Sequence, residues 1–463
     1  MLADSELAGF GEQNFGAADL GHKTRDACLV KLANLLQRHP GGTLPDKLAE
    51  PKNYKSMMRL VNRPEVTHAT VLQSHRQRTF RLMNEVKGSV VLLVHDQTVL
   101  DYSSLKSLAQ DLGPVGNGHG RGYLCHNSLA VDPQNRQVLG LANQILHRCD
   151  QVPEKESLPA KRMREGRESR LWTTAVRQIG PVAPDKLVVD VCDRGADVFE
   201  FLAWEVKHHR HFVVRSKSNR SLVVESPDAK PAYLHDYART LVSLGQKTIT
   251  VHGRDGALDR KAQVQVSAAA VTVKPPHETC GVYEKKPLTL WVVRVWEEHP
   301  PEGKEAVEWL LLTSEPAGQR QAAWEVASWY ECRWLVEEFH KAQKTGCNVE
   351  DVQFTTVAAL EPTIALLSVV ATTLLNLRSL SRQPEAKTLP ATTVVDADYV
   401  EVLSRWRYKE KRDLTIYEFF FALARLGGHQ NRKCDGHPGW LVLWRGWMKL
   451  QFMQTGYEIH GQT

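Results

Sequence analysis

The hydrophobic and polar positions divide the chain into helical ends and a middle part in which strands and helices alternate. In the first 85 residues apolar side chains recur every three or four positions, which predicts helices over 23–38, 54–61 and 66–86. From residue 362 onward the chain is again expected to be mostly helical. We therefore expect two helical regions that flank a different kind of fold.

The middle of the chain changes to a strand pattern at residue 89. SVVLLVHD (89–96) and KLVVDVCD (186–193) are short continuous apolar runs, which are typical of strands buried on both faces of a sheet. Further strands are expected over 123–131, 137–147, 211–217 and 309–315, and further helices over 167–179, 196–206 and 319 to about 344. This alternation predicts an α/β sheet. Residues 218–308 hold β-type segments joined by turns, which indicates a β-rich insertion.

Composition sets the class of protein. A length of 463 residues exceeds one compact core, and 42% hydrophobic with 24% charged residues is typical of a soluble globular protein. The longest apolar stretch, 364–377, is interrupted by Ser and Thr, so we interpret it as a buried core helix and not a membrane span. The N-terminus lacks the pattern of an export signal, and the eight scattered cysteines form no CxxC pair. We expect a cytoplasmic protein with no membrane association, whose net charge of +6 permits an acidic partner.

Two aspartates are expected at the ends of the buried strands, Asp96 after the first run and Asp193 after the second. Functional groups of α/β sheets gather at the carboxyl ends of strands. Each Asp taken alone is better explained as a helix cap or turn residue. Two such strand ends, each followed by small or polar residues, favour a shared site.

A third acid, Glu337, lies on the helix expected over 319–344. The polar residues of this helix share one broad face: Tyr330, Arg333, Glu337, His340, Lys341 and Lys344. Such a face is usually a solvated surface with ion pairs between turns. Here apolar bulk surrounds it, including Trp334 and Phe339, which places Glu337 against the sheet.

Three carboxylates from two strands and a helix suit a divalent metal ion. Mg²⁺ prefers a few carboxylates together with water and substrate phosphate. Two such ions about 4 Å apart can activate a hydroxyl and stabilise the leaving oxygen of a phosphoryl transfer. A glycosidase also needs two acids, but it has no use for a tyrosine, an arginine and two lysines on the same helical face. These residues predict chemistry on a phosphodiester backbone.

The spacing Y-x2-R-x3-E-x6-K, from Tyr330 to Lys344, resembles the YREK signature of bacterial cut-and-paste transposases. Further motifs match in order: HDQT (95–98), VCDRGAD (191–197), FVVRSK (212–217), EWLLLTSEP (308–316), EEFHKAQKTG (337–346), ARLGG (424–428) and W-x-x-LW-x-GW (440–447). On these motifs the chain resembles the insertion-sequence-four family of DDE transposases over nearly its full length.

The resemblance implies a ribonuclease-H-like mixed-sheet catalytic core over 73–375, with the β-rich insertion at about 218–308. It also implies a helical domain over 1–72 that binds transposon-end DNA and a helical domain over 376–463 that contacts DNA and dimerises. Asp96, Asp193 and Glu337, spaced by 97 and 144 residues, would form the catalytic metal-binding triad. Two Mg²⁺ ions, replaceable by Mn²⁺, would be the cofactors, and transposon-end duplex DNA, target DNA and a second copy of the chain the partners.

The resemblance also assigns DNA contacts. Tyr330, Arg333 and Lys344 would hold the phosphate at the transposon end, with Lys341 on the same helical face. Arg215 and Lys217 would follow phosphates nearby. Trp309 would receive a flipped base, because an aromatic face offsets part of the cost of unstacking. Core packing is the alternative explanation for Trp309.

The chain departs from the family pattern at two internal positions, where Gly195 replaces an acidic residue and Gln343 an aromatic one. It also ends sooner after the last GW motif, which affects the expected dimer helix. Taken alone, the basic residues among the N-terminal helices are better explained by an ordinary solvated surface than by DNA binding. The run RWRYKEKR (405–412), with five cations and two aromatics, suits phosphate contact or an exposed helix end.

Three functions remain after these arguments. The first is a transposase that nicks DNA ends, excises the element through hairpins and joins it to target DNA. The second is a metal-dependent endonuclease without strand transfer, which would share the carboxylate site. The third is an inactive, transposase-derived DNA-binding regulator, against which the intact set of three acids argues.

Overall fold

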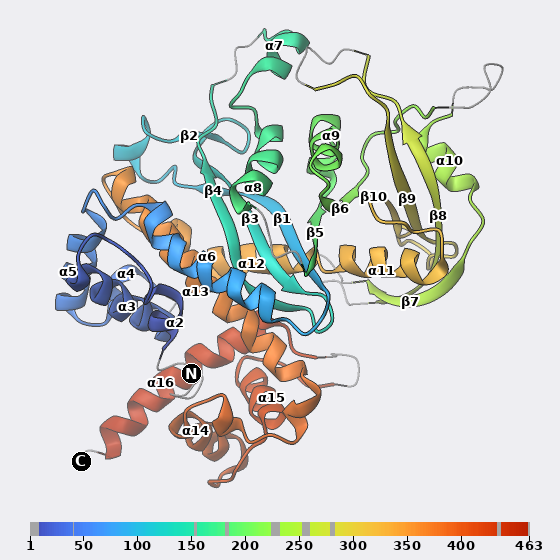
Figure 1. Cartoon of the computed structure of the whole chain (residues 1–463). Coiled ribbons are helices and arrows are strands. Elements are labelled where there is room, and N and C mark those ends of the chain that lie inside the picture. Colours follow the sequence, from blue (N-terminus) through green and yellow to red (C-terminus); the bar gives the residue numbers. More distant parts are fainter. Residues whose placement is uncertain are drawn as a thin grey trace.

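The structure is a computed structural model of the chain (Figure 1), and it describes residues 9–39, 41–151, 155–180, 185–223, 232–251, 260–277, 283–432 and 437–461. Residues 1–8 lie outside the described residues, so the structure does not test the expectation that the N-terminus lacks an export signal. The strands are β1 (Val90–Asp101), β2 (Gly113–Val115), β3 (Gly120–Asp132), β4 (Gln137–His147), β5 (Leu187–Cys192), β6 (His211–Arg215), β7 (Gly245–Val251), β8 (Arg260–Val273), β9 (Leu288–Glu297) and β10 (Glu308–Thr313).

The α-helices are α2 (Phe10–Phe15), α3 (Lys23–Arg38), α4 (Leu44–Leu48), α5 (Pro51–Val61), α6 (His68–Glu85), α7 (Leu158–Met163), α8 (Leu171–Ile179), α9 (Phe199–Lys207), α10 (Leu234–Thr240), α11 (Arg320–Glu331), α12 (Trp334–Lys341), α13 (Val357–Arg382), α14 (Ala397–Tyr408), α15 (Ile416–Leu426) and α16 (Trp440–Gly461). The short helical turns include η1 (Lys106–Leu108), η2 (Glu168–Arg170), η3 (Arg194–Ala196), η5 (Val349–Asp351), η6 (Pro384–Lys387), η7 (Ala391–Thr393) and the π-helical segment η4 (Ala342–Gly346).

The ten strands form one mixed sheet in the order β2-β3-β1-β5-β6-β10-β9-β8-β7, and β4 pairs with β3 beside β2. The β1–β5 and β5–β6 pairs are parallel, and the other pairs are antiparallel. The α/β class expected from the sequence is therefore confirmed. The β-rich insertion is an extension of the same sheet, because β9 pairs with β10 and β10 with β6.

Helices cover both faces of the sheet, and alternation along β1 shows which core each face supports. Leu92 and Val94 belong to a large apolar core that includes residues of α12 and α13. Val91 and Leu93 pack in a separate core on the other face, with Ile179 of α8. Side chains of neighbouring positions point to opposite faces of a strand, so α12 and α13 lie on one face and α8 on the other.

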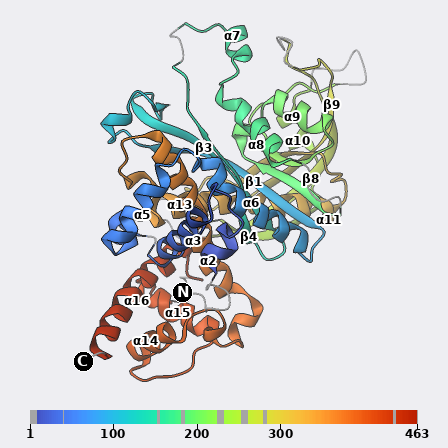
Figure 2. The ribbon, with the colours of Figure 1, turned by 60° about the vertical axis from the view of Figure 1, so that its left-hand side comes forward.

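The helical ends of the chain pack against the core that contains α13. Figure 2 shows α2, α3 and α5 beside α13, with α14, α15 and α16 gathered below the sheet. Buried apolar residues of these helices belong to the same core as α12 and α13. The domain boundaries expected at residues 72 and 375 fall within α6 and α13, and the division into domains stays a prediction.

The apolar stretch at 364–377 lies within α13. By length and composition this helix could cross a membrane, but 83% of its most apolar window is buried inside the protein. The interpretation as a buried core helix is therefore confirmed. The burial arises because α13 packs against α6 and β4 on one side and the C-terminal helices on the other.

Several element boundaries differ from the sequence prediction, and two of these differences affect the candidate site. β1 does not end at Asp96 but continues to Asp101, because β3 pairs with it up to Asp101 opposite Gly122. The single helix expected over 319–344 is divided into α11, α12 and η4. At the first break the amides of Cys332, Arg333 and Leu335 bond to carbonyls three residues back, which is the tighter 3₁₀ pattern and interrupts the α-helix.

Candidate active site

The register of β1 and β5 brings Asp96 and Asp193 together. The parallel pairing of these strands ends at His95 opposite Cys192, and each aspartate is the next residue along its strand. Two positions earlier, Val94 and Val191 both face the core that contains α12. Because side chains alternate along a strand, both carboxylates leave the sheet on the α12 side.

The aspartates differ in their local structure. Asp193 follows the last residue of β5 and caps η3, where its Oδ1 accepts a 2.7 Å hydrogen bond from the Gly195 amide. Asp96 lies within β1, and its Oδ1 accepts from the amide of Gln97 at 2.8 Å. The capping role considered for Asp193 is thus real, and it leaves the second carboxylate oxygen available.

Gly195, one of the departures from the family pattern, lies in a tight space. A Cβ atom at this position would stand 2.9 Å from the Trp172 ring and 3.0 Å from Oδ1 of Asp193. The turn after Asp193 therefore accepts a larger side chain only if the tryptophan moves.

Glu337 joins the aspartates from the first turn of α12. Arg333, at the start of this helix, connects the two elements: its Nη1 lies 3.2 Å from Oδ2 of Asp96, and its Nη2 pairs with Oε1 of Glu337. Asp96 and Arg333 are mostly buried, with side-chain exposures of 15% and 14%. The break between α11 and α12 thus places a guanidinium between two acids of the predicted triad.

The electrostatics of Asp96 show that all three acids interact. Burial raises the pKa of Asp96 to about 7, and the charges of Asp193 and Glu337 push it in the same direction. Arg333 acts against this shift but does not cancel it. Around Asp96, burial and the two neighbouring acids therefore outweigh the positive charge of Arg333.

This imbalance around Asp96 is the observation that fits a divalent metal ion. Among the described residues, no three His, Cys, Asp or Glu side chains stand close enough to form a metal-ligand group as they are placed. The donor set at the site consists of hard carboxylate oxygens, which Mg²⁺ and Mn²⁺ prefer. Asp96, Asp193 and Glu337 are therefore suitable ligands if the Arg333 guanidinium moves away from Asp96 and Glu337.

Tyr330, Arg215 and Trp309 lie beside the carboxylates. The Arg215 guanidinium donates to the Glu308 carbonyl at 3.0 Å, and Arg215 and Asp193 both influence the pKa of the Tyr330 hydroxyl. The Trp309 and Tyr330 rings pack edge to face with centroids 5.6 Å apart. Burial raises the pKa of Tyr330, so the phenol stays neutral and can donate a hydrogen bond. Trp309 is only half-buried, so part of its surface is accessible.

The three predicted lysines are less closely associated with the triad. Lys344, in η4, forms a 3.2 Å ion pair with Glu350. Lys341 is exposed and lies over the Trp334 ring at 5.3 Å. Lys217 is exposed at the end of the segment that follows β6. In the described structure no hydrogen bond or ion pair links any of the three to the carboxylates.

The residues expected to share one polar face of the helix differ in burial in the structure. His340 is buried, and this burial lowers the pKa of its ring to about 3, so the ring is neutral. Gln343, the second departure from the family pattern, is also buried and donates to the Ser368 hydroxyl of α13 at 2.7 Å. These two residues belong to the interior between α12, η4 and the sheet.

Sequence reasoning missed a second ionic cluster on the opposite face of the same strands. Asp190 of β5 is fully buried and accepts from His95 Nε2 at 2.9 Å and from Arg210 Nη2 at 2.7 Å. Glu205 of α9 lies 3.9 Å from the same arginine. The signal was present in the sequence, because Asp190 interrupts an otherwise apolar strand, but its partners come from distant segments.

Several of the outer basic residues have acidic partners. Arg405 and Lys411, of the run RWRYKEKR, both pair with Glu401, and Arg412 pairs with Glu418. α14 ends at Tyr408, within this run, so the exposed helix end that the sequence allowed is what the structure contains. In the N-terminal region Arg25 pairs with Glu65 at 3.1 Å.

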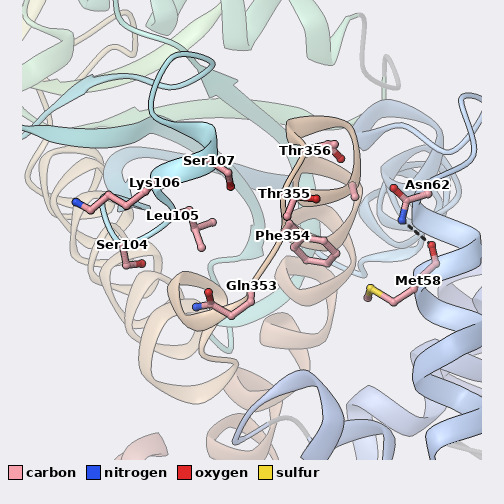
Figure 3. Close-up of a pocket in the computed structure, with 11 residues that line it drawn as sticks. Met58, Asn62, Ser104, Leu105, Lys106, Ser107, Gln353, Phe354, Thr355 and Thr356 are labelled. Atoms are coloured by element: carbon pink, nitrogen blue, oxygen red, sulfur yellow. Dashed lines mark hydrogen bonds between the residues drawn. The ribbon is translucent and has the colours of Figure 1, made fainter.

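Two cavities in the described part of the chain lie away from the triad. One, of about 330 Å³, opens between α5, the loop around η1 and the segment before α13, and Figure 3 shows Met58 and Asn62 across from Ser104 and Lys106. The other, of about 530 Å³, is lined by Arg121, among other residues. No triad residue is among those that line either cavity. No protein-family model matches the chain.

Proposed function

We propose that this protein is a metal-dependent DNA transposase of the insertion-sequence-four kind, with a ribonuclease-H-like core. One observation carries the proposal: Asp96, Asp193 and Glu337 lie close enough on one face of the sheet that the two other acids, together with burial, raise the pKa of Asp96 despite Arg333. The strand order β4-β3-β1-β5-β6, three antiparallel strands followed by two parallel ones, supports the ribonuclease-H-like assignment.

The three carboxylates would hold one or two Mg²⁺ ions, with Mn²⁺ as a substitute. When bound, the metal would activate the attacking hydroxyl and stabilise the leaving oxygen of the DNA strand. The remaining residues would bind and orient the substrate. Arg333 is already positioned between Asp96 and Glu337, so it can turn from the carboxylates to a phosphate when they take up a cation.

The aromatic and basic residues beside the triad suit DNA distorted at its end. Trp309 and Tyr330 form an edge-to-face pair next to Arg215, which supplies a cation at the same point. A base that leaves the duplex stack can pack on an aromatic ring of this kind. Excision through a hairpin needs such slack in the strand, whereas plain hydrolysis does not. This arrangement favours the transposase over the endonuclease without strand transfer.

The proposed partners are transposon-end duplex DNA, target DNA and a second copy of the chain, and the proposed setting is the bacterial cytoplasm. The test uses purified protein, Mg²⁺ and labelled DNA that carries the inverted repeats flanking the gene. We expect nicks, hairpins and joining to a target plasmid, all of which Glu337→Gln should abolish. Glu338→Gln, the neighbouring acid on α12, is the matched control and should retain all three activities.

The alternatives predict different products. An endonuclease would cut without hairpins or joined products. An inactive regulator would bind the end DNA but leave it intact. Equal activity of the wild-type and Glu337→Gln proteins would contradict the carboxylate site itself.

A further inference from the structure

A buried carboxylate outside the triad, Asp197, holds the segment that follows β6. Its side chain is completely buried, with an exposure of 0%. Oδ2 accepts from the backbone amides of Lys217 at 2.6 Å and Ser218 at 2.7 Å. Oδ1 accepts from Arg220 Nη2 at 2.6 Å and Nε at 3.2 Å. Both oxygens are therefore committed to one short piece of chain.

The position of Asp197 connects two strand ends. Asp193 caps the N-terminus of η3, and Asp197 follows the last residue of the same short helix. The segment that Asp197 holds begins directly after Arg215, the last residue of β6. One rigid turn therefore links a triad carboxylate to the backbone that carries Arg215 and Lys217.

Arg220 adds further hydrogen bonds to the contact between Asp197 and this segment. Arg220 is itself nearly buried, at 9% exposure, and its Nη2 also donates to the Asp197 carbonyl at 2.8 Å. Charge-assisted hydrogen bonds of this kind are about twice as strong as neutral ones. The Lys217 ammonium has no hydrogen bond or ion pair in the described structure, and the side chain is exposed. A fixed backbone thus presents an uncommitted cation to the solvent.

We propose that Asp197 is a positioning residue that fixes the 216–218 backbone, so that Lys217 meets a DNA phosphate beside the triad. This inference rests on the proposed function. Lys217 makes the DNA contact, and Asp197 positions the backbone of Lys217. Asp197 touches neither the DNA nor the reacting atoms. It acts through the amides of Lys217 and Ser218, whose direction decides where the lysine side chain leaves the surface.

The test is a double-mutant cycle on the full chain. The affinity for labelled end DNA is measured over a series of salt concentrations for wild type, Asp197→Asn, Lys217→Ala and the double variant. Losing one phosphate contact lowers the slope of log affinity against log salt by about one. We expect both single variants to show this loss and the double variant to be no worse than Lys217→Ala.

Asp236 of α10, which contacts the same stretch of chain, provides a matched control. Asp236 accepts a 3.1 Å hydrogen bond from the Asn219 side chain, so it contacts the segment without holding the backbone of Lys217. Asp236→Asn should leave the salt slope unchanged. Arg220→Lys, which keeps Asp197 and its charge, is the second variant in case Asp197→Asn fails to fold. It should lower the slope less than Asp197→Asn, and only while Lys217 is present.

The outcomes separate the two proposals. If wild type neither binds nor cuts end DNA, the proposed function fails. If wild type binds and Lys217→Ala lowers the slope, but Asp197→Asn and Arg220→Lys do not, only the positioning role is overturned. Additive losses in the double variant would also overturn it, because Asp197 would then act on binding independently of the lysine.

Discussion

The two faces of the β1–β5 pair carry acids in opposite electrostatic states. On one face, burial would raise the pKa of Asp190, but Arg210 and His95 outweigh it and hold that pKa below its ordinary value. On the other face, burial and the neighbouring acids raise the pKa of Asp96 to about 7 despite Arg333. Both aspartates lie on the same two strands, so the strands themselves do not cause the difference.

The difference lies in how far each acid is compensated. Arg210 donates two hydrogen bonds to Asp190, at 3.0 and 2.7 Å, while burial and the charge of Asp190 raise the pKa of Glu205. Asp190 therefore has its cationic partner within the protein. The face of Asp96 gathers three acids around one arginine. A buried acid with complete partners serves the fold, and one that lacks them is available to bind a cation.

The largest expected effect follows from the uncompensated face. Replacing Asp96 or Asp193 by Asn should lower the rate of DNA cleavage by at least about a hundredfold, because metal stabilisation of the transition state is worth several kcal/mol. Binding to end DNA should stay near the wild-type level. Denaturing gels measure cleavage, and a mobility-shift assay measures binding. Full cleavage by either variant would show that these carboxylates are not required for DNA cleavage.

The compensated face predicts a loss of stability. Asp190→Asn leaves Arg210 buried beside a neutral amide, and breaking a buried ion pair in this way costs about 3–5 kcal/mol. Chemical denaturation followed by fluorescence measures the change. Asp101→Asn, an exposed acid on β1, is the control and should cost little. A small effect at Asp190 would show that this cluster is not what joins the strands.

The two faces should also differ in their response to pH. Because the folded pKa of Asp96 lies above the ordinary value of 3.8, the folded state holds an extra proton between pH 3.8 and about 7. The ionised group therefore destabilises the fold most above pH 7. Asp96→Asn should raise stability by roughly 1–4 kcal/mol at pH 8, and the gain should vanish near pH 4. Denaturation curves at both pH values test this, and a stability loss at pH 8 would contradict it.

Trp309, on the same side of the sheet as Asp96, tests whether a flipped base stacks beside the carboxylates. Stacking of a flipped base is worth about 1–3 kcal/mol, or roughly five- to 150-fold in a step that depends on it. Trp309→Ala should nick end DNA almost normally but accumulate product without hairpins. Trp296→Ala, in the neighbouring strand β9, is a control for the loss of a tryptophan. Equal hairpin yields from wild type and Trp309→Ala would assign Trp309 to core packing alone.

The smallest expected effects concern the cations around the triad. Arg333→Ala and Lys344→Ala should each lower the salt slope of binding to cleaved ends by about one. Glu350→Gln should strengthen binding slightly, because Glu350 pairs with Lys344 in the protein without DNA. The gain should disappear in the Lys344→Ala background. Unchanged slopes in both alanine variants would show that Arg333 and Lys344 make only the ion pairs within the protein and no phosphate contact.

Much of the candidate site follows from short-range patterns. The two apolar runs locate β1 and β5, and alternation along them places Asp96 and Asp193 on one face. Helical spacing places Glu337 near Tyr330. The sequence could not show that the helix breaks at Cys332, because no Pro or Gly marks the position where the hydrogen bonds change to the 3₁₀ pattern.

Long-range partners were beyond sequence reasoning for a different reason. Asp197 lies in a motif that the sequence analysis quoted, yet its partners follow β6, about 20 residues later. His95 and Arg210 contact Asp190 only because three strands pair in the observed order. His340 has helical spacing that suits the polar face, and its burial depends on how α12 is rotated against the sheet.

The connection of β1 to its parallel partner β5 also determines when the site can exist. The two strands lie almost a hundred residues apart in the chain, and α12 comes later still. Contacts between such distant segments form slowly, because a long loop must close before they yield any energy. During synthesis the N-terminal helices and the β3–β4 hairpin can fold first, while Asp96 has no third carboxylate beside it. The three carboxylates can therefore come together only after residue 337 has left the ribosome, so the proposed site is among the last features of the fold to form.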